Sequence, residues 1–419
     1  MGTTHVATPQ AETLPKAANL ESALGGFLAG RYGFRFNVLT GATEFRCLPD
    51  GENGAFRPVT ERDLNAICLE AHRHGIDCWD RDVARMVHSA DVPEYHPFRQ
   101  YFQRLPAWDG RDRLHDLAAR VSDSPLWIQA FHRWMLGLAA QWAGFSDGLH
   151  AHSTAPLLVS DEQGLGKSTF CRALLPPELQ AYYTDSVDLA RPDKVERQLT
   201  EMGLLNLDEF DRIPEKKHPL LKNLMQLSAL NLRKAYQRHG QALPRIASFI
   251  ATSNSHELLS DPSGSRRFLC VEVEHPIDST GIDHAQIYAQ LKTMLLGGKR
   301  HGFTAEEEAE IQHANVTFYR TCPAEEAFAR HFRAARPDEE ALSVSLPELI
   351  ALLRKRQPGT LTGIGMQEFS RALVAAGVER RHTEKGNRYR IVPLENFISQ
   401  KGPTGLLHTP VSYTHLTLP

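Results

Sequence analysis

Three short, largely apolar runs divide the middle of the chain, at residues 157–159, 204–207 and 247–252. Each is bounded by polar or helix-periodic sequence, which is typical of strands buried on both faces of a parallel sheet. Strands of this kind that alternate with helices define the α/β class. The pattern therefore predicts an α/β domain over residues 150–300.

A helical period precedes this domain. Five large apolar residues recur at steps of three and four: Trp127, Phe131, Trp134, Leu138 and Trp142. This spacing places them on one face of a helix, and a buried core stripe explains it better than a platform for stacked bases. We predict a helical region over residues 96–149.

The N-terminal part carries a different pattern. Residues 1–22 are rich in Ala, Thr and Pro, which predicts disorder. Residues 32–39 and 43–48 alternate around a Thr-Gly turn and predict a hairpin, and residues 61–74 predict a helix. We interpret residues 23–95 as an accessory α+β region.

Beyond the α/β domain the pattern is again helical, first over residues 304–320. Two or three helices followed by a strand at 388–392 predict a winged-helix-like domain over residues 320–395. The last ten residues of the tail 396–419, PVSYTHLTLP, match nothing in the preceding composition. We interpret them as a gene-model artefact and exclude them from the fold.

The net charge of the 419-residue chain is −3, from 47 basic and 50 acidic residues. This balance gives no global attraction to nucleic acid or to an anionic membrane, so any DNA contact must come from local basic patches. Since no apolar run approaches the roughly 20 residues that span a bilayer, we expect no membrane association and a cytoplasmic location.

The cysteines are scattered and form no CxxC pair: Cys47, Cys68, Cys78, Cys171, Cys270 and Cys322. This spacing predicts neither a disulfide framework nor a zinc knuckle, and is typical of reduced thiols.

The strongest chemical motif follows the first apolar run. A phosphate-binding loop is predicted at Gln163, Gly164, Leu165, Gly166, Lys167, Ser168 and Thr169. Glycines let backbone N–H groups approach the phosphates of ATP, Lys167 reaches the β and γ oxygens, and Ser168 ligates Mg²⁺. Asp161 stands where the strict GxxxxGK[ST] pattern has glycine, and Gly164 can supply the missing flexibility.

Two acidic residues, Asp208 and Glu209, end the second apolar run about forty residues later. At this spacing after a phosphate-binding loop, Asp208 is expected to hold Mg²⁺ and Glu209 to polarise the attacking water. A purely structural strand end is the alternative.

Further polar residues follow the third run. Asn254 ends it and could orient the attacking water, or simply form a turn. Arg266 and Arg267 come next on a loop; either could stabilise charge on the transferred phosphoryl group, from the same or a neighbouring subunit. Solvated surface arginines are the alternative.

Two basic stretches are candidates for DNA. The first, at residues 232–239, contains Lys234, Tyr236 and Arg238, with Arg245 shortly after. Phosphate contacts with one stacked ring, or a solvated hairpin, both fit this composition. The second comprises Arg380, Arg381, Lys385, Arg388 and Arg390, and the same two interpretations apply.

The order of these motifs resembles a known family. LPAWDGRDRL, LVSDEQGLGKSTF, LLNLDEFD, LRKAYQRHG, FIATSN and GSRRF resemble the virulence-associated E family of P-loop ATPases from mobile elements, over about residues 96–274. That family is similar to superfamily 3 helicases and phage-type primase-helicases. The resemblance implies an α/β, AAA+-like three-layer ATPase core that assembles as a hexameric ring.

The resemblance also implies roles. Lys167 and Ser168 would bind the nucleotide, Asp208 and Glu209 would be the acidic pair, and Asn254 the sensor. Arg266 or Arg267 would be a finger acting across a subunit boundary. Lys234 and Tyr236 would lie on a channel hairpin that grips one DNA strand.

We therefore expect an ATP- and Mg²⁺-dependent DNA helicase or translocase that acts in replication of a plasmid, prophage or integrated element, with a separate primase as partner. Two interpretations remain open. One is a nucleotide-switched DNA-binding initiator that never unwinds, and the other a small-molecule P-loop kinase, which would need a lid and an acceptor pocket.

Overall fold

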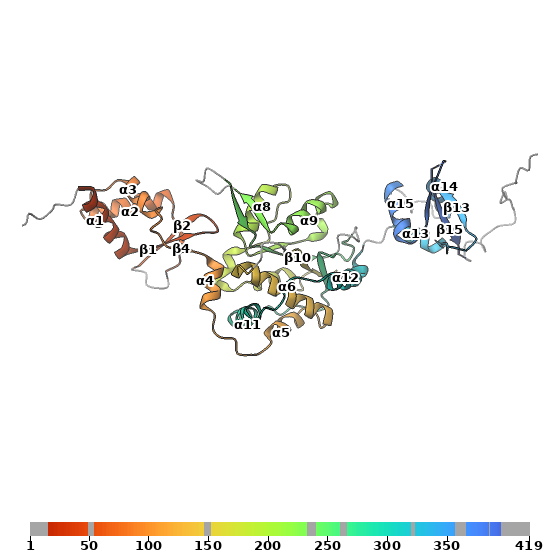
Figure 1. Cartoon of the computed structure of the whole chain (residues 1–419), viewed down its shortest axis with the longest axis horizontal. Helices are drawn as coiled ribbons and strands as arrows, with labels where there is room; N and C mark the ends of the chain where they lie inside the picture. The colour runs from red at the N-terminus through yellow and green to blue at the C-terminus, as the bar shows by residue number, and fades with distance from the viewer. Residues whose placement is uncertain are drawn as a thin grey trace, which may run out of the picture. The chain divides into compact units, whose positions relative to one another are not determined.

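The computed structural model describes residues 16–48, 54–145, 152–232, 240–259, 266–319, 323–356, 366–384 and 386–394 (Figure 1). The chain divides into two compact units, Met1–Tyr319 and Arg320–Pro419. The finer division at residues 23–95, 96–149 and 150–300 stays a prediction from the sequence.

The first unit opens with a four-stranded sheet and three helices. Their bounds are α1 Lys16–Arg31, β1 Tyr32–Asn37, β2 Ala42–Cys47, β3 Arg57–Pro58, α2 Glu61–Arg73, α3 Asp80–Val87 and β4 Glu94–Tyr95, with strand order β3-β2-β1-β4. The predicted hairpin and the predicted helix are both confirmed. The predicted disorder over residues 1–22 does not extend to its last part, because α1 begins at Lys16 and Leu20 packs against a buried core; residues 1–15 lie outside the described residues.

Three helices follow: α4 Pro97–Arg104, α5 Arg113–Ala119 and α6 Pro125–Ala143. The aromatic residues of the predicted stripe are buried in α6, which confirms the core interpretation. The prediction of a single apolar face is too narrow, however, because Met135, Leu136 and Ala139 are buried as well. A helix that is apolar on nearly all sides belongs inside a domain. Accordingly, α6 contacts α4, α5 and α11 as well as strands β5 and β11.

The α/β part contains a five-stranded parallel sheet in the order β11-β5-β10-β7-β6. Its strands are β5 Ala155–Val159, β6 Tyr183–Thr184, β7 Leu204–Leu207, β10 Ser248–Ser253 and β11 Phe268–Glu272. Its helices are α7 Lys167–Ala173, α8 Pro192–Glu201, α9 His218–Gln226, α11 His284–Leu296 and α12 Ala305–Ala314. A separate antiparallel pair is formed by β8 Ala229–Leu232 and β9 Gln241–Pro244.

Side chains of this sheet enter two different cores. Leu158 and Ile250 pack with α6 and α11, whereas Leu157, Phe249 and Ala251 pack with α8 and α9. Because successive strand residues point to opposite faces, this division means that helices cover the sheet on both sides. The buried apolar runs of the sequence are explained by this double cover.

The second unit has its own core around Phe328, Leu349, Phe369 and Tyr389. Its elements are α13 Pro323–His331, β12 Phe332–Ala334, β13 Leu342–Ser345, α14 Leu346–Arg356, α15 Met366–Ala375, β14 Arg380–Thr383 and β15 Gly386–Pro393. Strand β15 pairs antiparallel with β12, β13 and β14. The tail interpreted as an artefact lies outside the described residues. No helix in the described part of the chain is both long and apolar enough to cross a membrane.

Candidate functional site

The parallel sheet brings three loops together at the carboxyl ends of its strands, which form what is called below the carboxyl edge of the sheet. Strand β10 lies between β5 and β7, with Ser253 opposite Val159 and Ala251 opposite Leu207. All three strands run in the same direction, so the segments that follow them meet at their carboxyl ends. In open α/β sheets this edge is where ligands bind.

Lys167 is the centre of this edge. It begins α7 and is only 7% exposed, and its Nζ donates hydrogen bonds to Ser160 Oγ, to Asn254 Oδ1 at 2.9 Å and to the Glu162 carbonyl at 3.3 Å. Burial lowers the pKa of Lys167, while carboxylates that include Asp208 oppose that shift. A buried cation surrounded by oxygen acceptors is arranged to receive an anion.

Two glycines shape the loop before Lys167. Gly164 and Gly166 have φ of 84° and 82°, in the left-handed region that side chains disfavour. At Gly166 an added Cβ would also lie 3.3 Å from the Ile277 carbonyl oxygen. The loop therefore requires these glycines for its backbone path.

A hydroxyl and a carboxylate meet beside the loop. Ser168 Oγ donates to Asp208 Oδ1 at 2.7 Å, and Thr252 Oγ1 donates to the same oxygen. Hydroxyl and carboxylate oxygens are the hard ligands that Mg²⁺ prefers. The sequence predicted Ser168 and Asp208 as partners, whereas Thr252 was missed because it reads as an interior strand residue.

Glu209 follows Asp208 at the same edge, in an unusual backbone conformation. Its φ is 52°, and its carboxylate pairs with Arg212 at 2.6 Å. Holding a non-glycine residue in the left-handed region costs about 1–3 kcal/mol, and such residues often mark functional positions.

Asp211 is a further acid at this edge that the sequence prediction missed. Its Oδ1 accepts hydrogen bonds from Ser253 Oγ at 2.9 Å and from the backbone N–H of Asn254 at 3.3 Å. The available signal was the third acid of the run LDEFD. Asp211 fixes the segment that presents Asn254 to Lys167.

A histidine bridge, also absent from the prediction, lies next to the loop. His256 Nδ1 is 2.7 Å from Asp161 Oδ1, and its Nε2 is 3.0 Å from Glu272 Oε1. The hydrogen bond to Asp161, aided by Glu272, raises the pKa of His256. The imidazole thus connects the loop after β5 to the end of β11.

Arg266 and Arg267 are not brought to this edge. They precede β11, which pairs with β5 so that Phe268 lies opposite Ala155, and the Arg267 carbonyl accepts the Ala155 N–H at 2.8 Å. Both arginines therefore lie at the amino end of the sheet, about 15 Å, the length of the strand, from the carboxyl ends. Arg266 is 3.5 Å from Glu308 of α12.

The predicted DNA-binding residues Lys234, Tyr236 and Arg238 lie outside the described residues, in the connection between β8 and β9. The prediction that Arg245 belongs to this DNA-contacting basic stretch is wrong. Its guanidinium is buried and donates to the carbonyls of Met225, Ala247 and His152 at 2.6, 2.7 and 2.9 Å. Arg245 therefore holds the chain between β9 and β10.

The C-terminal basic run is partly neutralised. Arg381 and Arg390 both pair with Glu379, at 2.6 and 2.9 Å, and Arg388 pairs with Glu348 at 3.1 Å. Lys385 lies outside the described residues. Paired guanidiniums give a weaker attraction for phosphates than the sequence run suggests.

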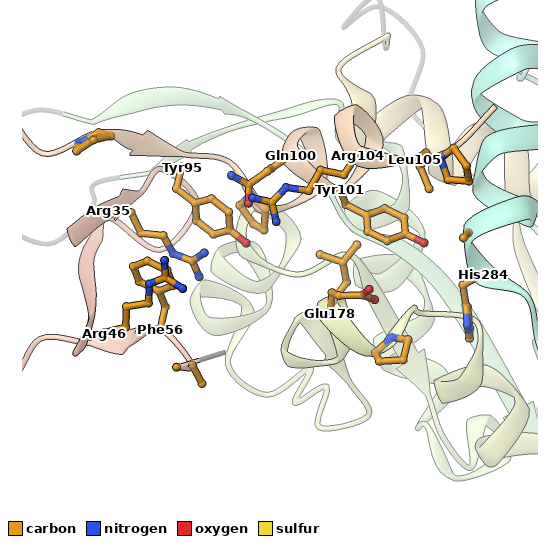
Figure 2. A pocket seen from close by; sticks show the side chains of 18 of the residues that line it. Arg35, Arg46, Phe56, Tyr95, Gln100, Tyr101, Arg104, Leu105, Glu178 and His284 are labelled. Atoms are coloured by element: carbon orange, nitrogen blue, oxygen red, sulfur yellow. The ribbon is translucent and has the colours of Figure 1, made fainter. Parts of the chain in front are cut away.

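A separate cavity of about 1100 Å³ lies between the N-terminal sheet and the segments around α4 and α11 (Figure 2). The Arg35 guanidinium lies 3.5 Å from the ring centroid of Tyr95 and 4.0 Å from that of Phe56, and pairs with Glu44 at 2.6 Å. The lining balances three arginines against three acids: Arg35, Arg46, Arg104, Glu94, Glu178 and Asp283. It includes none of the residues predicted to bind ATP.

The fold and the polar edge together define an α/β protein with a parallel sheet and a candidate anion- and cation-binding site at the strand ends. A family model described as the virulence-associated protein E-like domain matches residues 102–320, more than half of the chain. The chain belongs to this family. A second model, described as a domain of unknown function from a B. Theta gene, matches residues 321–391.

Solved structures give more distant similarities. The apo structure of the NrS-1 C-terminal region (305–718) is 12% identical with a TM-score of 0.44, and the match covers 89% of this chain and 98% of that one. An A form of the same region gives the same identity and score and is covered to 99%. A search of curated proteins finds no match.

Proposed function

We propose that the chain binds ATP and Mg²⁺ at the carboxyl edge of the parallel sheet and hydrolyses the nucleotide. The observation that carries this proposal is the meeting of Lys167, the Ser168–Asp208 pair and Asn254 at the ends of three adjacent strands. This set supplies a cation for phosphate oxygens, oxygen ligands for a metal and an amide at the reacting end.

Each residue has one task in this proposal. The loop from Gln163 to Thr169 wraps the phosphates with its backbone N–H groups, and Lys167 moves its hydrogen bonds from Ser160 and Asn254 to phosphate oxygens. Ser168 and Asp208 hold Mg²⁺, which neutralises charge on the phosphates. Glu209 accepts the proton of the attacking water, and Asn254 orients that water.

We assign the finger to a neighbouring subunit. Within one chain, Arg266 and Arg267 are both separated from the loop that contains Lys167 by the length of β11. Neither arginine therefore reaches a nucleotide held by the same sheet. A ring in which the amino edge of one sheet meets the carboxyl edge of the next removes this separation. Such an arrangement is the homo-oligomeric, AAA+-like ring that the resemblance implies.

Membership of the virulence-associated protein E-like family supports a role in replication of a mobile element, as a DNA helicase or translocase. The connection between β8 and β9, with Lys234, Tyr236 and Arg238, would grip one DNA strand. The second unit, with three helices and an antiparallel sheet, would serve as the winged-helix-like domain. A separate protein would supply primase activity.

Lys167→Ala tests the nucleotide site. We expect hydrolysis to be abolished and ATP binding to be weakened, because the substitution removes a positive charge that would contact the phosphates. Steady-state phosphate release and nucleotide titration measure the two effects. The matched control is Lys194→Ala on the exposed side of α8, which should keep wild-type turnover. Turnover of Lys167→Ala within a few-fold of wild type would refute the assignment.

The proposal that the chain unwinds DNA is tested by a second measurement. DNA-stimulated hydrolysis together with displacement of a strand from a forked duplex supports unwinding. Stimulation without displacement at any protein concentration would identify a nucleotide-switched initiator, because a switch needs only binding and hydrolysis. Transfer of phosphate to a small molecule, with no response to DNA, would identify a kinase.

A further inference from the structure

Three soft metal-ligating side chains meet in the N-terminal sheet and helix region, far in sequence from the proposed nucleotide site. They are Cys68 and His72 on α2 and Cys78 in the segment before α3. One potential ligand atom from each lies within 4.8 Å of the others. Cys68 Sγ is 3.9 Å from His72 Nε2, which is itself 2.6 Å from the Cys78 carbonyl oxygen.

Local structure explains this meeting. Cys68 and His72 are four residues apart and so share one face of α2. Helix α2 ends at Arg73 with His74 as its C-cap, and Gly75 adopts φ of 77°, a left-handed conformation that reverses the chain. The Ile76 N–H then returns to the Ala71 carbonyl at 3.1 Å, which brings Cys78 back against the helix.

The donor set is specific in its chemistry. Two sulfurs and one imidazole nitrogen suit Zn²⁺, which binds cysteine at about 2.3 Å and histidine at about 2.0–2.1 Å. Tetrahedral geometry at these lengths places neighbouring ligand atoms about 3.5–3.8 Å apart. To surround one ion, the three side chains must close slightly, and the hydrogen bonds that His72 Nε2 and Cys68 Sγ make to the Cys78 carbonyl, at 2.6 and 3.6 Å, must open.

The burial and the charge of these three side chains also favour a Zn²⁺ site. Cys68 and Cys78 are 8% and 2% exposed, whereas His72 is an exposed residue whose Nε2 is turned toward the Cys78 carbonyl. Two thiolates and one Zn²⁺ sum to zero charge, which is the condition for burying such groups without a large desolvation cost. The exposed side leaves an entry path for the ion and a fourth position for water.

We propose that Cys68, His72 and Cys78 bind one Zn²⁺ ion, with water as the fourth ligand. The ion connects α2 to the segment that begins α3. Its role is structural, because the binding of an ion stabilises the fold that brings its ligands together. The absence of a CxxC spacing hid the site from the sequence, since the ligands follow C-x₃-H-x₅-C.

The test uses the full-length protein, untagged and purified under reducing conditions without chelator. We expect about one zinc per chain by elemental mass spectrometry. Cys68→Ser, Cys78→Ser and His72→Ala should each lower zinc affinity by at least about 10–100-fold. Cys47→Ser is the matched control, because this thiol on β2 lies outside the cluster and its loss should leave the zinc content unchanged.

Cobalt substitution provides an independent readout. Co²⁺ added to the metal-free protein should give a thiolate charge-transfer absorption in the wild type and in Cys47→Ser, and this band should be clearly weaker in Cys68→Ser, which keeps a single thiolate ligand. His72→Ala keeps the proposal testable if the cysteine variants do not fold, because its side chain is exposed. Binding of neither zinc nor cobalt to the wild type would overturn the proposal. So would equal zinc content in the wild type and His72→Ala, or a Cys68–Cys78 disulfide in protein purified without reductant.

Discussion

Glu209 combines two features at the residue scale: it is the proposed base, and its backbone is held at φ of 52°. The adjoining Asp208 is tied to Ser168 and Thr252, so the backbone on that side is fixed. The Glu209 carboxylate is held in an ion pair with Arg212 at 2.6 Å. Nucleotide binding would have to release that carboxylate toward the attacking water.

Glu209→Gln should keep ATP bound and lower hydrolysis by about 10²–10⁴-fold, because the amide preserves the shape of the side chain but cannot accept a proton. Nucleotide titration and single-turnover phosphate release measure the two quantities. Glu215→Gln, an exposed change a few residues along the chain, should behave as wild type. Normal turnover of Glu209→Gln would place the base elsewhere.

His256 gives a prediction about pH. Its pKa is raised, first by the hydrogen bond to Asp161 and also by Glu272. A folded pKa above the unfolded value of about 6.5 means that the contribution to stability is fully present below pH 6.5. It is then lost as pH rises through the folded pKa. The imidazole also stacks on Phe318, with the two rings 4° from parallel, and that contact does not depend on charge.

We therefore expect the difference in Tm between wild type and His256→Gln to be larger at about pH 5.5 than at about pH 9. Differential scanning calorimetry at both values measures it. His313→Gln, on the exposed side of α12, controls for general effects of losing a histidine. A difference that is equal at the two pH values would show that the ion pairs with Asp161 and Glu272 contribute nothing.

At the scale of elements, the packing of α6 and the position of Arg245 hold the sheet in place. The Gln141 side chain of α6 donates to the carbonyls of Ile246 and Ala247, both at 3.1 Å. The Arg245 guanidinium donates to further backbone carbonyls, including that of Met225. Burial lowers the pKa of this guanidinium, which nevertheless stays charged at neutral pH. These bonds fix the entry of β10, the strand that carries Asn254.

Arg245→Ala should lower the free energy of unfolding by at least about 2 kcal/mol, because several buried carbonyls lose their donor. It should leave the salt dependence of DNA binding unchanged, since a buried guanidinium contacts no phosphate. Chemical denaturation and DNA titration at several salt concentrations measure the two effects. Arg191→Ala, which removes an exposed arginine 4.0 Å from Asp188, should change stability by less than about 0.5 kcal/mol. A weaker salt dependence in Arg245→Ala would restore the DNA-contact interpretation.

At the scale of the whole molecule, the position of the two arginines makes the proposed site depend on assembly. A Lys167→Ala subunit keeps its arginines, and an Arg267→Ala subunit keeps its nucleotide loop. In a mixed ring, an intact loop can therefore face an intact finger. In a monomer no such complementation is possible.

The arginine variant that removes the finger should by itself lose about three to five orders of magnitude in hydrolysis. Mixing Lys167→Ala with Arg267→Ala should recover part of the activity, and Arg266→Ala tested in parallel identifies which arginine is the finger. Phosphate release measures recovery, and native mass spectrometry verifies that mixed rings form. Mixed rings without any recovery would exclude a shared site and leave both arginines with a surface or structural role.

Much of the fold follows from local pattern. The β7 strand has the predicted bounds, and β5 and β10 differ by one or two residues, because a buried strand must be apolar wherever it is placed. The loop with Gly164, Gly166 and Lys167 was predictable for a similar reason, since its conformation requires glycines at fixed offsets. The all-round burial of α6 was not predictable from one aromatic stripe, because its partners include α11 and β11, which lie well over a hundred residues later in the chain.

The sequence by itself determined most of the elements and the glycine and lysine pattern of the loop after β5, because each depends on neighbours within a turn or a strand. It also singled out Ser168 and Asp208 individually, but the strand order β5-β10-β7 is what brings them together. Only the tertiary structure decided three other features. It buried Arg245, it placed Arg266 and Arg267 at the edge of the sheet away from Lys167, and it gathered Cys68, His72 and Cys78. The physical reason is that strand order and chain reversal set these distances, and neither is encoded in the identity of the residues that they bring together or keep apart.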